Sequence, residues 1–270
     1  MKVEIFFWVV LTGYWLSWLF YFLNFETQKE FYFGFAKKIL IVCLILHFLL
    51  IVCISTTGLW PATQRLEAAV PFAILVLSFL MEWKYRARFL TLFSLPIALL
   101  LTLFALWHAH RRPGTELWAP DAWFWIHIGF IFSGLAGFVT ALSSAMMYLL
   151  QSSQLKSHHP GKIFLRLPAL DALDKIHFRS LAGGVILFSL GILSGLYWAT
   201  DLKELRAIIR DPIVLLSLLT CFMYWVIVGL RLSALRRGQK IALGSLIVFL
   251  LLSVTMMSSY YLPFSLHRGL

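Results

Sequence analysis

Two histidines far apart in the chain have side chains that can bind a metal. His127 lies among aromatic residues, beside Trp123 and Trp125, and His267 follows the last apolar run. Tryptophans of this kind gather at membrane–water interfaces, so we expect both histidines at the same edge of a membrane. A neutral imidazole nitrogen is a common metal ligand, and two of them can hold the iron of haem from both faces. The alternatives stay open: His127 as one more interfacial residue, and His267 as a residue of a disordered tail.

Three further residues could belong to such a site. His47 lies near the middle of an apolar run, where an ionisable group is costly and usually faces the interior of a helix bundle. It is interpreted either as a histidine hydrogen-bonded to a neighbouring helix or as an inner haem ligand or relay. Trp198 is either an interfacial residue or a wall that stacks against a porphyrin ring. Arg268 could pair with a carboxylate such as a haem propionate.

The remaining histidines and the cysteines point to no second metal site. His108 and His110 lie two apart, on different faces of a helix, and are expected at a solvated helix end. His158, His159 and His177 are expected on the opposite side of the membrane from His127. The three cysteines fall inside apolar runs with no paired spacing, so we expect buried apolar packing and no disulfide.

These residues must be positioned by membrane helices. Hydrophobic residues make up 61% of the 270 and charged residues only 13%, which excludes an ordinary soluble domain. Apolar runs of about 20 residues recur, the length that crosses a bilayer. The sequence therefore predicts an all-α, polytopic integral membrane bundle, a single membrane domain over residues 1–270 with about eight transmembrane helices. The predicted spans are 4–23, 37–58, 69–85, 89–108, 123–150, 180–200, 213–233 and 240–262. The first is interpreted as a retained helix, because it is too long for a signal peptide and no A-x-A site follows it.

In a membrane protein the distribution of charges between the two sides of the membrane matters more than the net charge, which is +11 here. We therefore expect no nucleic-acid partner. Of the 23 lysines and arginines, 15 fall in the loops after the first, third, fifth and seventh spans, and 8 fall on the other side. The positive-inside rule then predicts both termini outside. We expect a multi-pass protein of the cell inner (cytoplasmic) membrane, in contact with membrane lipid.

Small residues indicate where helices pack closely. After His127, the span 123–150 continues with small residues at three- and four-residue spacing, from Ser133 to Ser144. Gly191-x-x-x-Gly195 gives the sixth span a similar face. We therefore expect the fifth span to be central, with His127 facing inward. Before the sixth span, Leu170, Leu173 and Ile176 recur every three residues, which predicts a short amphipathic helix lying on the membrane.

The sequence lacks the motifs of several common enzyme classes. The chain has no phosphate-binding glycine loop, no G-x-S-x-G and no H-E-x-x-H. Acidic residues inside the spans are almost lacking, which disfavours a proton-coupled transporter. Whether the protein is an enzyme is left open; we expect no self-contained catalytic activity.

Several segments in order resemble the cytochrome c assembly family, which includes CcsA, CcmC and the HemX-like proteins. The opening run from Gly13 to Phe22 resembles the HemX-like branch. The run from Trp125 to Gln151, the segment 167–174 and the glycine-rich sixth span are similar to the family's central region.

The resemblance implies a set of haem ligands and a partner. His127 matches the first outer-face histidine of CcsA-type members, His267 corresponds to the second, and His47 to a histidine inside the bundle. The chain departs from that pattern at two places. The tryptophan-rich segment is reduced to Trp198 and a distant Asp211-Pro212, and Gly229 occupies the position of another bundle histidine. The HemX-like branch is therefore favoured.

These observations lead to one main hypothesis and two alternatives. The main hypothesis is a membrane haem-handling protein for c-type cytochrome biogenesis that binds haem b at the outer face. It would act with a CcsB-like subunit that presents the apocytochrome. The alternatives are a HemX-like, non-enzymatic regulator or scaffold of tetrapyrrole synthesis, and a small-molecule permease.

Overall fold

The structure is a computed structural model that describes residues 2–57, 62–111, 122–156, 161–201, 211–233 and 238–261. Every regular element in this described part is an α-helix, which confirms the predicted all-α class. The helices are α1 (Lys2–Thr27), α2 (Glu30–Thr57), α3 (Ala62–Tyr85), α4 (Leu90–Arg111), α5 (Ala122–Lys156), α6 (Lys162–Arg166), α7 (Leu170–Asp201), α9 (Pro212–Leu232) and α10 (Gln239–Tyr261).

The long helices coincide with the predicted spans. Seven of those described, α1 to α5, α7 and α9, are long and apolar enough to cross a membrane, and α10 contributes a shorter apolar stretch, Gln239–Thr255. Their lengths match the roughly 20 residues that a hydrocarbon core requires. The protein is therefore a multi-pass membrane protein, and the expectation of about eight spans is confirmed.

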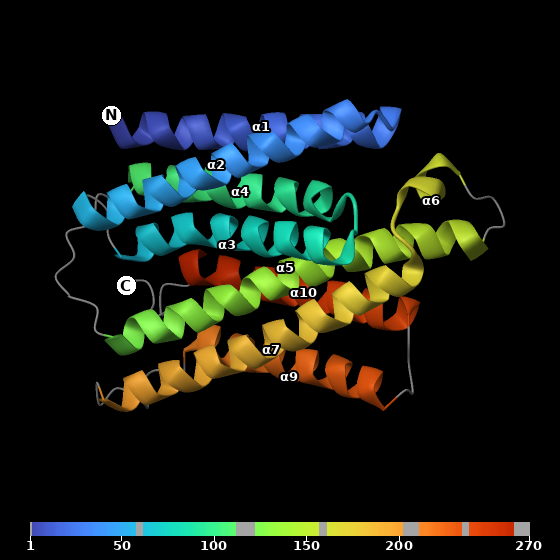
Figure 1. Ribbon diagram of the computed structural model, residues 1–270. Helices are drawn as coiled ribbons and strands as arrows, with labels where there is room; N and C mark the ends of the chain where they lie inside the picture. Colours follow the sequence, from blue (N-terminus) through green and yellow to red (C-terminus); the bar gives the residue numbers. More distant parts are fainter. Residues whose placement is uncertain are drawn as a thin grey trace. The chain divides into compact units, whose positions relative to one another are not determined.

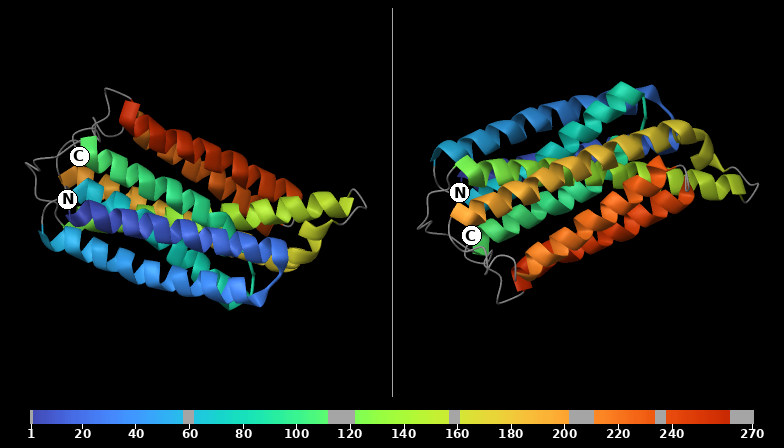
Figure 2. Two further views of the ribbon diagram at one scale, coloured as in Figure 1. Left: turned by 90° about the horizontal axis from the view of Figure 1, so that it is seen from above. Right: turned by 90° about the horizontal axis from the view of Figure 1, so that it is seen from below.

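The chain forms two compact units (Figure 1). Unit 1 contains α1 to α4 together with residues 166–168, and unit 2 contains α5, α7, α9 and α10. In unit 1 the helices contact one another in a closed ring, α1–α2–α3–α4 and back to α1. Unit 2 has the same cyclic pattern, α5–α7–α9–α10 and back to α5. Figure 2 shows the α9–α10 pair of unit 2 running side by side.

Unit 1 is built on a seam between α1 and α2. The buried residues of both helices recur at alternating spacings of three and four, as in a coiled coil. They are Phe7, Val10, Tyr14, Ser17, Tyr21 and Asn24 in α1, which also buries Phe25, and Ala36, Leu40, Cys43, His47, Leu50 and Ile54 in α2. Four of the first six carry hydroxyl or amide groups, so the seam is partly polar.

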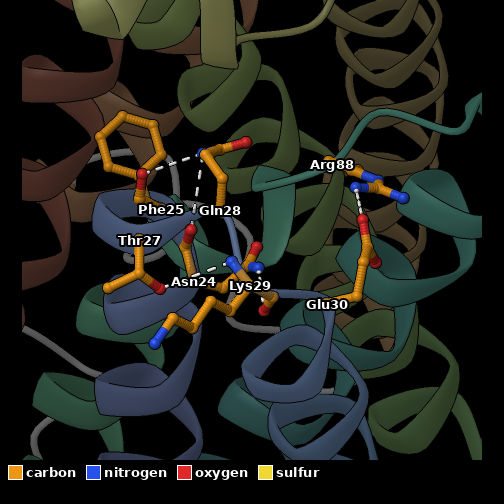
Figure 3. Close-up of polar contacts among 7 residues, drawn as sticks. All are labelled: Asn24, Phe25, Thr27, Gln28, Lys29, Glu30 and Arg88. Atoms are coloured by element: carbon orange, nitrogen blue, oxygen red, sulfur yellow. Dashed lines mark hydrogen bonds and ion pairs between the residues drawn. The ribbon is translucent and has the colours of Figure 1, made fainter.

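A two-residue turn joins α1 to α2 (Figure 3). Gln28 adopts a left-handed φ of 58°, the conformation that commonly ends a helix. Its backbone N–H donates to the backbone carbonyl of Asn24 at 2.7 Å. The Asn24 side chain in turn donates to the carbonyl of Lys29 at 2.8 Å. The first residue of α2, Glu30, pairs with Arg88 at 2.6 Å. The bonds of Gln28 and Asn24 thus hold the turn between α1 and α2, and the Glu30–Arg88 pair links α2 to the segment between α3 and α4.

Unit 2 is built on close packing of α5 against α7. A Cβ added at Gly137 would lie 2.8 Å from the Cα of Gly184, and one added at Gly134 would lie 2.8 Å from the backbone nitrogen of Phe188. The two backbones thus approach closely because these positions lack side chains. Phe138 stacks on Tyr224 of α9, with ring centroids 4.1 Å apart. The predicted central role of the fifth span is confirmed within unit 2.

One predicted element is wrong. The segment expected to be a separate amphipathic helix on the membrane surface is the first part of α7, which runs without a break from Leu170 to Asp201. Its apolar residues Leu173 and Ile176 are fully buried in the bundle. Burial of Leu173 and Ile176 in unit 2 favours one continuous helix. Hydrogen bonds also join this segment to α9 and α10.

The cysteines are free thiols. Cys43 and Cys221 are buried, as predicted, whereas Cys53 lies exposed on the surface of α2. In a helix that spans a membrane, an exposed thiol of this kind faces lipid as a small apolar group.

Candidate functional site

His127 lies near the start of α5 with its ring against α7. Its Nδ1 is 2.6 Å from the carbonyl oxygen of Gly191. A Cβ added at Gly195 would lie 2.6 Å from the same Nδ1 and 2.7 Å from the ring Cε1. The Gly191-x-x-x-Gly195 pattern thus provides both the hydrogen-bond partner and the space for this imidazole. The ring faces inward, as the small-residue pattern predicted.

The hydrogen bond determines which ring nitrogen of His127 carries the proton. A backbone carbonyl can only accept, so Nδ1 must donate to Gly191. In the neutral imidazole Nε2 then carries the lone pair. Histidines that ligate metals are commonly held in this way, with the other ring nitrogen donating to a carbonyl. In its neutral form His127 is therefore in the tautomer that would ligate a metal through Nε2.

Aromatic side chains from α5 and α7 surround this position. Trp123 contacts Tyr197 with ring centroids 4.5 Å apart, and Phe124 contacts Trp198 edge-on at 5.6 Å. Trp198 is buried, only 7% exposed, whereas Tyr197 is 56% exposed. The edge-on contact orients the Trp198 indole. Its role as a wall against a porphyrin ring stays a prediction.

The helix ends of unit 2 define where this cluster lies. The start of α5, the end of α7, the start of α9 and the end of α10 share one end of the unit (Figure 1). At this end Asp211 is buried and caps α9, with its Oδ1 accepting from the amide of Ile213 at 2.9 Å. Asp211-Pro212 thus starts a helix in the usual way, with an N-cap acid followed by proline.

Several predicted residues lie outside the described part of the chain. They are His267 and Arg268, the second ligand and the propionate partner, together with His158 and His159. The side chains of His108 and His110 are also outside it. The pairing of His127 with His267 therefore stays a prediction.

His47 belongs to unit 1. It is fully buried in α2, its Nδ1 is 2.8 Å from the hydroxyl of Tyr14 in α1, and Phe72 of α3 packs edge-on against the ring at 5.8 Å. Its buried Nε2 has no hydrogen-bond partner among the described residues, although the Ala68 backbone lies near the ring. A bond to a neighbouring helix was one of the two interpretations of His47. Its role as inner ligand or relay stays a prediction.

Sequence reasoning missed two residues of unit 1. The contact of Tyr14 with His47 could not be predicted, because the sequence does not show which residue a given tyrosine contacts. Glu82 is buried near the end of α3; it accepts from the Tyr21 hydroxyl at 3.1 Å and from the Thr91 amide at 3.0 Å. Thr91 is the second residue of α4, so the carboxyl group satisfies an amide that the helix leaves unpaired. Glu82 thus joins α1, α3 and α4.

The other end of unit 2 contains a second polar cluster. His177 is buried, with Nε2 2.8 Å from the hydroxyl of Ser245 in α10, and Asp174 forms an ion pair with Arg231 of α9. His177 lies 14 residues before Gly191 in the same helix, about 21 Å along its axis. The prediction that His177 is too far away to share a site with His127 is confirmed. Among the described residues, no three His, Cys, Asp or Glu side chains gather around a metal position.

Comparison with known proteins gives one match. The family model described as "Cytochrome C assembly protein" matches residues 60–267, about three quarters of the chain. The matched region begins just before α3 and includes all of unit 2 that the structure describes. No curated protein and no solved structure matches the chain.

Proposed function

The chain belongs to the cytochrome c assembly protein family and acts in c-type cytochrome biogenesis, and on that premise we propose that it binds haem at the His127 end of unit 2. Members of this family are associated with haem. The proposed group is haem b, bound without a covalent link and handled at the outer face of the inner membrane.

One observation carries the proposal. The Nδ1 of His127 donates to the Gly191 carbonyl, so an iron atom ligated by this imidazole would bind at Nε2. The hydrogen bond also favours the present ring orientation, because rotation of the imidazole would break a 2.6 Å contact.

His267 is the proposed second ligand. The end of α10 at Tyr261 lies at the same end of unit 2 as the start of α5 (Figure 1). His267 is six positions after Tyr261 in the sequence, and an extended chain of that length reaches about 20 Å. This reach supports a second imidazole on the same side as His127.

The remaining proposed contacts are Arg268 with a propionate, through a charge-assisted hydrogen bond, and Trp198 as a flat wall. When bound, haem would supply an iron atom, and His127 and His267 would hold it. In this arrangement the protein binds and orients haem for a partner. The proposed partner is a CcsB-like subunit that presents the apocytochrome, with both termini of the chain outside.

The test is spectroscopic. The protein purified from haem-replete cells, or titrated with haem in detergent, is expected to show a Soret band typical of two imidazole ligands. His127→Ala should remove most of this band, whereas His177→Ala, which alters a buried histidine about 21 Å away, should retain it. Absence of a Soret band from the wild-type protein under both conditions would refute the proposal.

A HemX-like scaffold of tetrapyrrole synthesis is the second candidate. Two observations favour it: Gly229 stands where CcsA-type members are expected to have another bundle histidine, and Asp211-Pro212 serves as a helix cap. The double variant His127→Ala, His267→Ala separates the two functions. Loss of cytochrome c in cells with this variant supports haem handling, whereas normal cytochrome c levels support the scaffold.

A further inference from the structure

One end of unit 1 carries more basic than acidic side chains. This end contains the turn between α1 and α2 and the segment between α3 and α4 (Figure 1). We propose that it binds the headgroup of an anionic phospholipid, with Lys37 and Arg88 as the principal contacts. The proposal goes beyond haem handling and involves no residue of unit 2.

The acidic side chains at this end already have partners. Glu30 pairs with Arg88 at 2.6 Å. Glu26 pairs with Arg166 at 3.4 Å. Glu82 is buried, and each of its two oxygens accepts a hydrogen bond. Among the described residues, no hydrogen bond or ion pair joins a carboxylate to the other basic side chains at this end, which are Lys29, Lys37, Lys38, Lys84 and Arg86. An anion from outside the chain would complement their charge.

The Phe33 ring in α2 brings two cations together. The Lys37 ammonium lies 5.1 Å from the ring centroid, and the central carbon of the Arg88 guanidinium lies 5.0 Å from it. Phe33 is itself held by an edge-on contact with Tyr21, with ring centroids 5.9 Å apart. An aromatic face attracts cations but has no net charge, so it orders the two groups without neutralising them. Arg88 can contact a phosphate while it pairs with Glu30, because a guanidinium has five N–H donors.

Lys37 extends towards the membrane surface. It is the eighth residue of α2, so its Cα lies about 10 Å along the axis from the start of the helix. Phe33 is one turn nearer that start, and the ammonium lies over its ring. The ammonium interacts with Glu82 only at longer range, without an ion pair. A lysine that extends from within a span to the interface in this way places its charge among the lipid headgroups.

The segment between α3 and α4 adds basic side chains at the same end. Ala87 and Phe89 are buried, whereas Lys84, Arg86 and Arg88 are exposed. Burial of the alternate residues fixes the segment against unit 1 and directs the basic side chains outward. A surface that is ordered before binding loses little conformational entropy when a ligand arrives.

The residues beyond Lys37 favour a lipid over a soluble anion. Ile41 and Ile45 lie one and two turns further along the same face of α2, and they are 43% and 56% exposed. A phospholipid would place its phosphate at Lys37 and an acyl chain along these two side chains. Basic clusters at the edge of membrane helices are suited to headgroups with a net negative charge.

Native mass spectrometry of the detergent-solubilised protein tests the proposal by titration with phosphatidylglycerol. The wild-type protein is expected to bind this lipid roughly tenfold more tightly than zwitterionic phosphatidylcholine. Lys37→Gln should weaken the binding about fivefold, the contribution of one basic residue near an anionic lipid surface. Lys240→Gln is the matched control. It removes the same charge from an exposed residue of α10 on the same predicted side of the membrane, and it should leave the affinity unchanged.

Two further variants distinguish a binding site from the effect of net charge. Glu30→Gln removes the carboxylate that competes for Arg88 and should strengthen the binding about two- to fivefold. Phe33→Leu keeps every charge but removes the ring that orders the two cations, and it should weaken the binding about two- to fivefold. Phe31→Leu changes an exposed ring in the same helix that lies under neither cation, and it should have no effect.

Equal affinity for the two phospholipids would overturn the proposal, as would equal effects of Lys37→Gln and Lys240→Gln. If no phosphatidylglycerol is bound, the proposal is also wrong, and an acidic segment of a partner protein would be the occupant that the charge fits. Each of these results is measured without haem. A failure of the lipid site is therefore distinct from a failure of haem binding at His127.

Discussion

Unit 1 joins its helices through side chains, whereas unit 2 joins α5 to α7 through backbone contact. In unit 1, Tyr14 bonds to His47, Ser17 to the Ala36 carbonyl and Tyr21 to Glu82, so α1 is tied to α2 and α3, and Glu82 also bonds to α4. In unit 2, glycines at 134, 137, 184, 191 and 195 remove the side chains that would separate α5 from α7. The same ring of four helices is thus achieved by two kinds of seam.

The difference between the seams affects the chemistry of the histidine in each. Where α5 and α7 touch, a carbonyl of one helix comes within reach of a side chain of the other, and His127 is fixed in one tautomer. Where α1 and α2 are separated by side chains, His47 meets a hydroxyl, which permits two tautomers. The packing residues therefore determine whether an imidazole meets a carbonyl, which fixes one tautomer, or a hydroxyl, which permits two.

The largest expected effect is on unit 1. Glu82→Ala removes the acceptor of two buried hydrogen bonds, to Tyr21 and to Thr91, and should destabilise the protein by about 2–4 kcal/mol. Reversible unfolding in detergent measures the change. Glu30→Ala is the control, because Glu30 and Arg88 are both more than half exposed and such pairs contribute about 0–1 kcal/mol. Equal effects of the two substitutions would contradict a polar seam.

The next effect is on the glycine seam of unit 2. Gly137→Ala places a methyl group 2.8 Å from the Cα of Gly184, so α5 and α7 must separate, and we expect a loss of about 1–3 kcal/mol in the same unfolding assay. At Gly129 in α5 an added Cβ meets nothing within 4 Å. Gly129→Ala should therefore be neutral or slightly stabilising. A neutral Gly137→Ala would show that the backbones are not in close contact.

A smaller effect on stability, but a selective one on haem binding, is expected at Gly195. The added methyl group of Gly195→Ala overlaps the His127 ring and should displace it from the Gly191 carbonyl. We expect haem affinity to fall roughly tenfold, corresponding to about 1.4 kcal/mol, as measured by Soret titration. Gly183→Ala, in the same helix with open space around it, should bind haem like the wild type. If both variants bound equally well, the glycine would not position the ligand.

The features of the fold that depend on local sequence pattern could be predicted from the sequence. Apolar runs locate the spans, and the spacing of small residues from Ser133 to Ser144 predicts close packing of the fifth span. The inward orientation of His127 follows from both. These properties can be predicted because a segment in lipid must form its backbone hydrogen bonds internally, as a helix does. Glycines at helical spacing in such a segment usually indicate close packing against another helix.

Partners on other helices could not be predicted. The bond between Tyr14 and His47 depends on the register between α1 and α2, and nothing in either helix reveals that register alone. Glu82 is near the end of its span, where an acidic residue usually meets water, but the start of α4 covers it. The boundary before α7 was missed because an amphipathic pattern does not distinguish a membrane surface from a bundle surface.

The most direct measurement is chemical rescue of the proposed ligand. His127→Gly should lose most of the Soret absorption of the wild-type protein, and added imidazole should restore it with the wild-type band position, because Gly191 can still accept a hydrogen bond from the added ring. His47→Gly gives the comparison within the same chain, since His47 is fully buried in unit 1 and its removal should leave the spectrum of haem at His127 unchanged. A wild-type spectrum in His127→Gly before imidazole is added would contradict the account.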